Sequence, residues 1–284
     1  FNLMIPKEPW EREKLIVDNS KEPITQSRLV EDLFSIGLKS GDVVIVHSSM
    51  SQIGWIVGGA VTVIEALMES VGKEGTLVVP THSTDNGEPS PWQYPSVPES
   101  WWQIIRDEYP PYRPDITPAR RVGRLPEVFR KYPNVSRSNH PQVSWAAWGK
   151  YAQYITESHP LDHVYDEKSP LGRAYELDSK ILLIGVTHEV NTALHFAETK
   201  THIEGFPWMN WSAAVLENGV RVWKTWKERN YSSDDFHLIG EAFETTINYE
   251  LKNIGQAPSR LISLREIVDF AVEWMEKNRS YEST

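Results

Sequence analysis

Three short apolar runs, separated by stretches of helical periodicity, constrain most strongly what this chain can fold into. They cover residues 43–47, 76–81 and 180–186. Continuous apolar runs of this length, rich in β-branched side chains, are typical of strands that are covered on both faces of a sheet. A helical pattern over residues 60–71 follows the first run, and a helix start near Asn191 follows the third. This alternation predicts a mostly parallel sheet with helices on its faces.

A second signal adds antiparallel structure later in the chain. Asn218-Gly219 separates two strand-like runs, and this dipeptide is the strongest short signal for a hairpin. We therefore expect an α/β fold: an α/β/α sandwich around a mixed, mostly parallel sheet, with an added antiparallel hairpin. Two further helices are expected over about residues 234–249 and 263–277.

The segment from His82 to Pro118 differs from its surroundings. It is rich in proline, aromatic and acidic residues, and it sustains no period. A loop of this length inside a compact domain usually has a function, such as a lid or a substrate wall, and a mobile surface insertion is the alternative. Because no repeat or interdomain linker is visible, we expect a single domain over residues 1–284 with a long loop insertion at about 82–118.

Charge and cysteine content argue against several classes of protein. The formal net charge of -10 disfavours a nucleic-acid partner, because sequence-independent binders need a basic surface. An acidic surface attracts polycations, although moderate negative charge can also simply aid solubility. The chain has no cysteine, so disulfides, thiolate metal sites and a cysteine nucleophile are excluded, and a cytoplasmic location is expected. No apolar run approaches the roughly 18 residues that a membrane span needs.

Histidines follow each of the three predicted strands. His47 closes the first strand, His82 follows the second, and His188 follows the third. If the strands are parallel, these side chains lie at the carboxyl edge of the sheet, where open α/β folds bind their ligands. His195 enters the same region from the helix that begins near Asn191. We expect a polar site at this edge, unless some of the histidines only satisfy backbone groups in the core.

His195 and Glu198 are the leading candidates for chemistry at this edge. They stand three residues apart, so on a helix they share a face. In the first turn of a helix, the dipole favours the neutral imidazole that a general base requires. Glu198 is suited to orient the ring or to hold a cationic substrate. The pattern His-x-x-Glu is weak alone, so this interpretation depends on the other motifs.

Three further groups of residues are suited to binding. Residues 48–60 lead through paired glycines into a helix, where free backbone N–H groups can hold a pyrophosphate; a tight strand-to-helix connection is the alternative. Arginines at residues 120–124 and 137 indicate phosphate recognition or a solvated charged face. Asp234 and Asp235 precede a helix, so one can cap it while the other points into a cleft.

Taken together, the motifs of the chain carry a resemblance to a known family. They are Val46-His47-Ser48-Ser49, Gly54 with Gly58-Gly59-Ala60, Gly123-Arg124-Leu125-Pro126-Glu127, Arg137-Ser138-Asn139-His140-Pro141 with Ser144, His159-Pro160, Ser169-Pro170-Leu171-Gly172, and Asn191-Thr192-Ala193-Leu194-His195-Phe196-Ala197-Glu198. In this order and spacing they resemble the antibiotic N-acetyltransferase family, of the aminoglycoside 3-N-acetyltransferase type, and they look closest to its Bacillus prophage-type member. The resemblance covers most of the chain.

The resemblance implies transfer of an acetyl group from acetyl-CoA, as co-substrate, to the 3-N amine of an aminoglycoside or to a similar polyamine sugar. It carries the catalytic histidine onto His195, the adjoining acid onto Glu198 and a further acid onto Asp235, although residues 231–236 depart from the family's usual pattern. The residues expected to bind coenzyme A are His47, Ser48, Ser49, Gly58, Gly59, Ala60 and Arg124. Those expected to bind the acceptor, a cationic small-molecule amine, are His82, Asp85 and Asp234.

Alternatives stay open for the reaction. Without a cysteine, direct transfer in a ternary complex is favoured, and a serine acyl-enzyme lacks the elbow motif that would support it. A metal-dependent hydrolase would also use clustered histidines and carboxylates, but no HExxH or comparable pair is present, so no metal is expected. A relative that binds coenzyme A or an amine without turning over antibiotics is the third possibility. The acceptor amine and the oligomeric state are left open.

Overall fold

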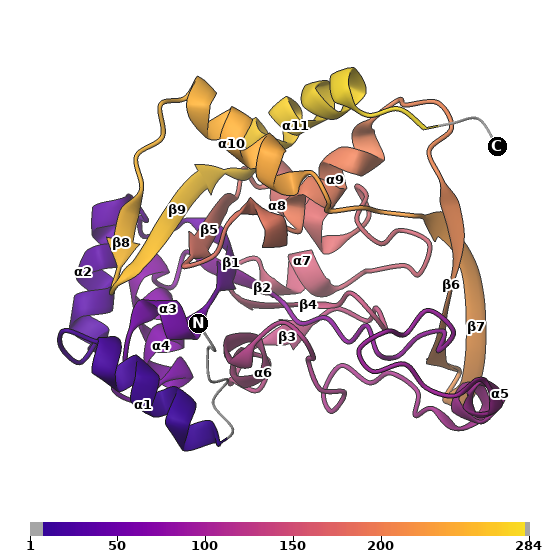
Figure 1. The fold of residues 1–284 in the computed structure, drawn as a ribbon. Coiled ribbons are helices and arrows are strands. Elements are labelled where there is room, and N and C mark those ends of the chain that lie inside the picture. Colours follow the sequence, from indigo (N-terminus) through magenta and orange to yellow (C-terminus); the bar gives the residue numbers. More distant parts are fainter. Residues whose placement is uncertain (1–7, 282–284) are drawn as a thin grey trace, which may run out of the picture.

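A seven-stranded sheet forms the centre of the molecule, with helices on both faces (Figure 1). The computed structural model describes residues 8–281. The order of the strands is β3-β4-β2-β1-β5-β9-β8. They are β1 (Val43–Ser48), β2 (Thr76–Pro80), β3 (Ser136–Arg137), β4 (Trp145–Gly149), β5 (Lys180–Ile184), β8 (Lys252–Ile254) and β9 (Ala257–Ser263).

The three predicted strands occupy the middle of this sheet. β1 pairs in parallel with β2 on one side and with β5 on the other. The outer pairs, β2–β4, β3–β4, β5–β9 and β8–β9, are antiparallel, so β4 and β9 run against the direction of the other strands. The predicted mixed α/β architecture is confirmed. The strand pairs that run in parallel are confined to the centre of the sheet.

Alternate side chains of the central strands enter two separate cores, as the period of a strand requires. On β1, Val44 and Val46 pack on one face, whereas Val43 and Ile45 pack on the other. The first face is covered by α2 (Gln26–Ile36), α3 (Met50–Ile53), α4 (Ala60–Val71) and α6 (Arg124–Phe129). The second is covered by α7 (Ala152–Thr156), α8 (Pro170–Glu176), α9 (Ala193–Lys200), α10 (Phe236–Thr246) and α11 (Leu264–Asn278).

Figure 1 shows α8 to α11 along the upper side of the sheet, and the amino-terminal helix α1 (Pro9–Asn19) beside α2 and α4. A short 3₁₀ turn, η1 (His188–Val190), connects β5 to α9. The last two helices, α10 and α11, lie where the sequence predicts them. Within residues 8–281, no helix is long and apolar enough to cross a membrane.

The predicted hairpin is confirmed as a separate two-stranded sheet of β6 (Trp208–Glu217) and β7 (Val220–Arg229). Its turn residues, Asn218 and Gly219, have φ of 51° and 79°, the positive values that a type I′ turn requires. The hairpin stands at the end of the molecule opposite α1 and α2 (Figure 1). It therefore forms a wall beside the sheet rather than extending it.

The segment over residues 82–118 contains a helix, which corrects the expectation that it has no regular period. α5 (Glu99–Glu108) lies beside the lower end of the hairpin in the view of Figure 1. Arg221 of β7 donates hydrogen bonds to the carbonyl oxygens of Arg106 and Tyr109, where α5 ends. Because these bonds come from a strand more than 100 residues away along the chain, local sequence gives little sign of them.

Candidate active site

His195 and Glu198 lie side by side on α9, as their spacing predicts. His195 Nδ1 is 2.5 Å from Glu198 Oε2. The Glu198 side chain is fully buried, whereas 16% of the His195 side chain is exposed. An ionised carboxylate can only accept hydrogen bonds, so this contact assigns the ring proton to Nδ1 and leaves a lone pair on Nε2. Among residues 8–281, Nε2 has no hydrogen-bond partner, which leaves it free to accept a proton.

Three aromatic rings hold the imidazole of His195 in place. Tyr165 stacks on it with 4.7 Å between ring centroids and an interplanar angle of 15°. Tyr231 meets its edge at 5.5 Å, and Phe236 lies at 4.8 Å. Aromatic packing on several sides restricts rotation of the ring, so the direction of Nε2 is fixed before any substrate binds.

The second carboxylate oxygen of Glu198 is held by an arginine from the end of α11. Glu198 Oε1 accepts hydrogen bonds from Arg279 Nη1 at 2.6 Å and from the Ser232 N–H at 3.2 Å. Arg279 also binds both carboxylate oxygens of Asp235, at 2.7 Å and 2.5 Å. Although burial opposes the charge, the carboxylates of Asp235 and Glu198 raise the pKa of Arg279. We call His195, Glu198, Arg279 and Asp235 the His195 network.

The two aspartates before α10 have different places in this arrangement. Asp235 is the N-cap residue of α10, but its side chain binds Arg279 rather than the helix end. Asp234 is exposed, and its N–H donates to Ser232 Oγ at 3.2 Å. Within the part of the chain that the structure describes, Asp235 is joined to His195 through Arg279 and Glu198, and neither aspartate contacts the imidazole.

A cleft of about 660 Å³ opens at the carboxyl edge of β1 and β2. Its lining residues are Ile16, Val46, His47, Ser48, Ser49, Met50, Ser51, Pro80, His82, Arg121, Val122, Gly123, Arg124, Pro126, Val186, Val190 and Thr192. His195 itself is not among them and lies one helical turn beyond Thr192. His82 connects the two places, because it lines the cleft and is near enough to His195 to be affected by its charge.

His47 and His82 form a neutral part of the cleft wall. Both rings pack edge-on against Trp145, at centroid distances of 6.4 and 5.6 Å. Burial lowers the pKa of His47 to about 4. Burial, with the nearby His47 and His195, lowers the pKa of His82 to about 3. Each has a buried Nε2 atom with no partner among the described residues.

The residues expected to bind coenzyme A fall into two groups. His47, Ser48, Ser49 and Arg124 line the cleft, and Arg124 is exposed at its rim without an ion pair inside residues 8–281. The segment Gly58–Ala60 is not part of the lining. Its glycines adopt φ of 82° and 62° in the connection that leads into α4. That geometry explains the glycines without a ligand and leaves their binding role a prediction.

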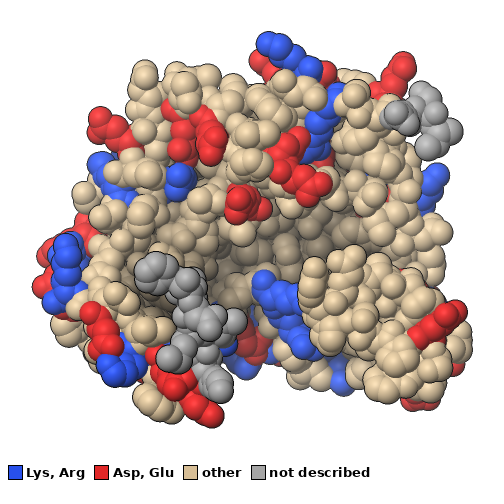
Figure 2. All heavy atoms as spheres, viewed as in Figure 1, with Lys and Arg blue, Asp and Glu red and all other residues tan. Residues whose placement is uncertain are grey.

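The predicted acceptor residue Asp85 already has partners. Its carboxylate accepts hydrogen bonds from Tyr109 Oη at 2.9 Å and from Arg120 Nη1 at 2.8 Å. Glu88, three residues further on, forms an ion pair with Arg106. Figure 2 nevertheless shows acidic side chains along the upper border of the hollow in this face, and basic ones along its lower border. The negative charge that would attract a polycation therefore lies along the upper border of the hollow rather than at Asp85 alone.

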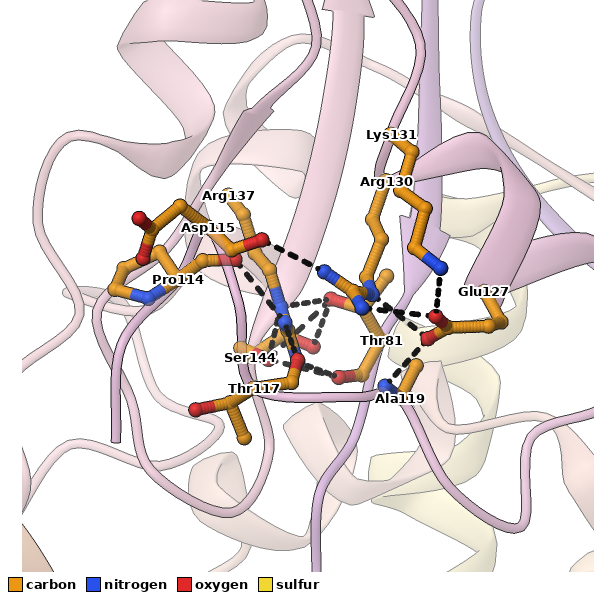
Figure 3. Close-up of polar contacts among 10 residues, drawn as sticks. All are labelled: Thr81, Pro114, Asp115, Thr117, Ala119, Glu127, Arg130, Lys131, Arg137 and Ser144. Carbon is orange, nitrogen blue, oxygen red and sulfur yellow. Dashed lines mark hydrogen bonds and ion pairs between the residues drawn. The ribbon is translucent and has the colours of Figure 1, made fainter. Parts of the chain in front are cut away.

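Arg137, grouped above with the arginines of residues 120–124, has a structural position (Figure 3). Its guanidinium donates to the residue that follows β2, to the residue that precedes β4 and to the segment before α6. The acceptors belong to Thr81, Pro114, Thr117 and Ser144. Because all these donors are directed at the protein, Arg137 is not available to a phosphate.

His188 also has an internal role, although it follows β5 at the same edge. Its Nε2 is 2.9 Å from Glu244 Oε1 on α10, and Arg260 binds the same carboxylate. Gly240 packs so closely that an added Cβ would lie 2.1 Å from the His188 ring. The expectation that some of the histidines only satisfy core groups therefore describes His188. Within residues 8–281, no group of three or more histidine, aspartate and glutamate side chains is arranged to hold a metal ion.

These features define an α/β fold with a histidine–carboxylate pair beside a cleft at the carboxyl edge of its sheet. The model of the aminoglycoside 3-N-acetyltransferase family matches residues 45–276. The chain therefore belongs to this family of acetyltransferases.

Individual relatives agree with this assignment. The chain is 43% identical over 268 residues to the SPbeta prophage-derived aminoglycoside N(3')-acetyltransferase-like protein YokD of Bacillus subtilis, covering 94% of this chain and 98% of YokD. The crystal structure of YokD matches with a TM-score of 0.90, over 93% of this chain and 98% of that one. AAC-IIIb, in a binary complex with CoASH, matches with a TM-score of 0.82 at 31% identity, over 93% and 100% of the two chains. AAC-VIa bound to sisomicin matches with 0.80 at 30% identity, over 91% and 99%.

Sequence reasoning missed the residues that support His195 from a distance. Arg279 lies 81 positions after Glu198, and Tyr165 lies 30 positions before His195. Tyr231 donates from its hydroxyl to the buried Glu228, which also belongs to no local motif. The single weak signal is the basic residue that follows α11, which alone reads as an ordinary helix end.

Proposed function

We propose that the chain transfers an acetyl group from acetyl-CoA to an amine of an aminoglycoside, at the 3-N position, or of a similar polyamine sugar, by direct transfer in a ternary complex. The observation that carries this proposal is the contact of His195 Nδ1 with the buried Glu198, which leaves Nε2 as a proton acceptor. Support comes from relatives that bind CoASH and sisomicin, AAC-IIIb and AAC-VIa. Resistance to an antibiotic and a cytoplasmic location belong to the same proposal.

The chemistry requires a base because the acceptor is protonated near neutral pH. His195 Nε2 takes one proton from the ammonium group, and the neutral amine attacks the carbonyl carbon of the thioester. The carbon–sulfur bond breaks, and the second proton of the attacking nitrogen passes to the thiolate that leaves. His195 then releases its proton to solvent. Glu198 stabilises the imidazolium that forms in between, as a buried carboxylate does in other His–acid pairs.

The cleft residues fit a coenzyme with phosphate groups and a thioester. Arg124 offers an exposed cation at the rim, and Ser48 and Ser49 offer hydroxyls at the end of β1. The unpartnered Nε2 atoms of His47 and His82 lie deeper in the wall. The rings of His47 and His82 are neutral, so this part of the wall is suited to the uncharged thioester and amide groups of the coenzyme.

The test is thiol release from acetyl-CoA across a panel of aminoglycosides, with wild type and His195→Ala. We expect the variant to lose turnover by at least about 10³-fold while acetyl-CoA still raises its melting temperature. His202→Ala is the matched control, because His202 is an exposed histidine, and it should behave as wild type. Unchanged turnover in His195→Ala would remove His195 from the mechanism.

A second candidate is a relative that binds coenzyme A and an amine without turning over antibiotics. It is favoured by the pairing of Asp85 with Arg120, because a paired carboxylate offers less charge to a polycation. Stabilisation by acetyl-CoA with no acetylation of any amine tested would support it. Metal analysis of the purified protein separates the third candidate, since stoichiometric zinc would favour a hydrolase.

A further inference from the structure

Arg279 binds the carboxylate that contacts His195, although it follows the last helix of the fold. The exposed fraction of its side chain is 9%. Its backbone N–H donates to the Met275 carbonyl at 2.8 Å, which anchors the residue at the C-terminal end of α11. From there the guanidinium reaches Glu198, Asp235 and the carbonyl oxygen of Ser232.

Glu198 is the carboxylate that joins Arg279 to His195. The carboxylate is fully buried and needs a nearby positive charge to remain ionised. Arg229 does not supply that charge to the carboxylate, because its Nη1 donates to the backbone carbonyl of Glu198. Arg279 therefore makes the one arginine contact with this carboxylate among the residues that the structure describes.

The ionised state of Glu198 decides which nitrogen of His195 faces the substrate. If Glu198 is ionised, Oε2 accepts from Nδ1–H, and Nε2 carries the lone pair that a base needs. If Glu198 takes a proton, it can donate to Nδ1 instead, and the ring proton moves to Nε2. The second tautomer cannot remove a proton from an amine.

We propose that Arg279 is a positioning residue that keeps Glu198 ionised and so holds His195 in the tautomer that acts as a base. The proposal rests on the proposed function for the role of His195. Asp235 acts one step further away, because its two contacts with Arg279 fix the guanidinium in the plane that meets Glu198. The acid assigned to Asp235 by resemblance thus acts on Arg279 and not on the substrate.

The kinetic test is Arg279→Ala, assayed for thiol release with and without millimolar guanidinium chloride. We expect kcat to fall by about 10²-fold while KM for acetyl-CoA changes by less than about twofold. Guanidinium should restore at least about a tenth of the lost rate by occupying the vacated space, and the same concentration of sodium chloride should not. Arg265→Ala is the matched control on the same helix, since Arg265 is 46% exposed and pairs with Asp178, so its kinetics should be those of wild type.

The second measurement is the ¹⁵N spectrum of the histidine rings in the free enzyme, which distinguishes the two tautomers without any substrate. The His195 signals should show a proton on Nδ1 in wild type and a shift of the proton toward Nε2 in Arg279→Ala. This arm stays informative if no acceptor amine is found, so failure of the proposed function and failure of the present proposal are distinguishable.

Two milder variants cover the case in which Arg279→Ala does not fold. Arg279→Lys keeps the charge and loses the two-point contact with Asp235, and Asp235→Asn weakens the same contact from the other side. Each should lower kcat by about tenfold. Acetyl-CoA should raise the melting temperature of each variant by as much as it raises that of wild type. Wild-type kcat and an unchanged His195 spectrum in these variants would overturn the proposal. So would a loss in Arg279→Ala that guanidinium does not relieve and that leaves the tautomer unchanged.

Discussion

Two arginine-centred regions of this molecule, around Arg279 and around Arg137, use the same side chain for different ends. Each guanidinium is largely buried and ties together segments that are distant in sequence. Arg279 meets the carboxylates of Glu198 and Asp235, and the contacts continue through Glu198 to His195 Nδ1. Nε2 of the same ring has no partner in residues 8–281. Arg137 meets hydroxyl and carbonyl oxygens, and no carboxylate within the described chain contacts it (Figure 3).

The pKa of each arginine follows from these partners. Burial lowers the pKa of Arg137, because neutral acceptors do not fully compensate the loss of water around its charge. At Arg279 the carboxylates outweigh burial and the pKa rises. A network that ends inside the protein stabilises the fold, whereas one that ends at a free nitrogen prepares a reaction. The distinction lies in where the contacts stop.

The largest expected effect separates the regions by stability. Arg137→Ala removes a donor group that binds acceptors in four residues, and we expect a loss of about 3 kcal/mol in the free energy of unfolding. Turnover per folded molecule should stay within about twofold of wild type, unlike that of Arg279→Ala. Urea unfolding and thiol release measure the two quantities. In the control Lys131→Ala, the lost ion pair joins Glu127 to Lys131, whose side chain is 59% exposed. This change should lower the free energy of unfolding by less than about 0.5 kcal/mol. Lost turnover at unchanged stability in Arg137→Ala would break the comparison.

An effect that is smaller per residue concerns His47 and His82, two buried histidines that lack a charged partner. The pKa values of His47 and His82 are lowered by burial to about 4 and about 3, so both stay neutral in the folded chain while the unfolded chain takes up protons below about pH 6.5. Stability is therefore lost as the pH falls below about 6.5. At pH 5 each histidine should contribute about 2 kcal/mol to that loss.

This acid sensitivity is measured by urea unfolding of wild type and of the variant His47→Gln/His82→Gln at pH 7.5 and pH 5. The difference between the two pH values should be smaller in the variant, because glutamine does not titrate. An equal pH dependence in both proteins would show that the histidine wall is not the source. His195 is present in both proteins, so its own titration contributes equally to the two pH dependences.

The smallest expected effect sharpens the contrast between paired and unpaired arginines. Arg124 is exposed at the rim of the cleft, and Arg124→Gln should raise KM for acetyl-CoA by about three- to tenfold with little change in kcat. Arg113→Gln provides the control, because Arg113 is exposed outside this cleft. A fall in kcat at constant KM would instead assign Arg124 to the reaction step.

Much of the fold is visible in local patterns, and the reasons are physical. The strands β1, β2 and β5 are covered on both faces, so they read as continuous apolar runs. The Asn-Gly turn marks the hairpin because few other residues tolerate two positive φ angles in succession. The sequence does not predict the strands β4 and β9, because neither is a run of β-branched residues and each depends on a partner far away in the chain, as Ala147 does on Val78.

The candidate site divides along the same line. The pairing of His195 with Glu198 can be predicted from the sequence, because one turn of helix places residues three apart on one face whatever surrounds them. The ionised state of Glu198 and the free direction of Nε2 depend on Arg279, Tyr165 and Tyr231, which only packing brings to the ring. A contact between residues 81 positions apart has no spacing to recognise, since its geometry follows from how α9 and α11 pack on the sheet. Local periodicity therefore located the histidine–carboxylate pair, and long-range packing determined what surrounds it.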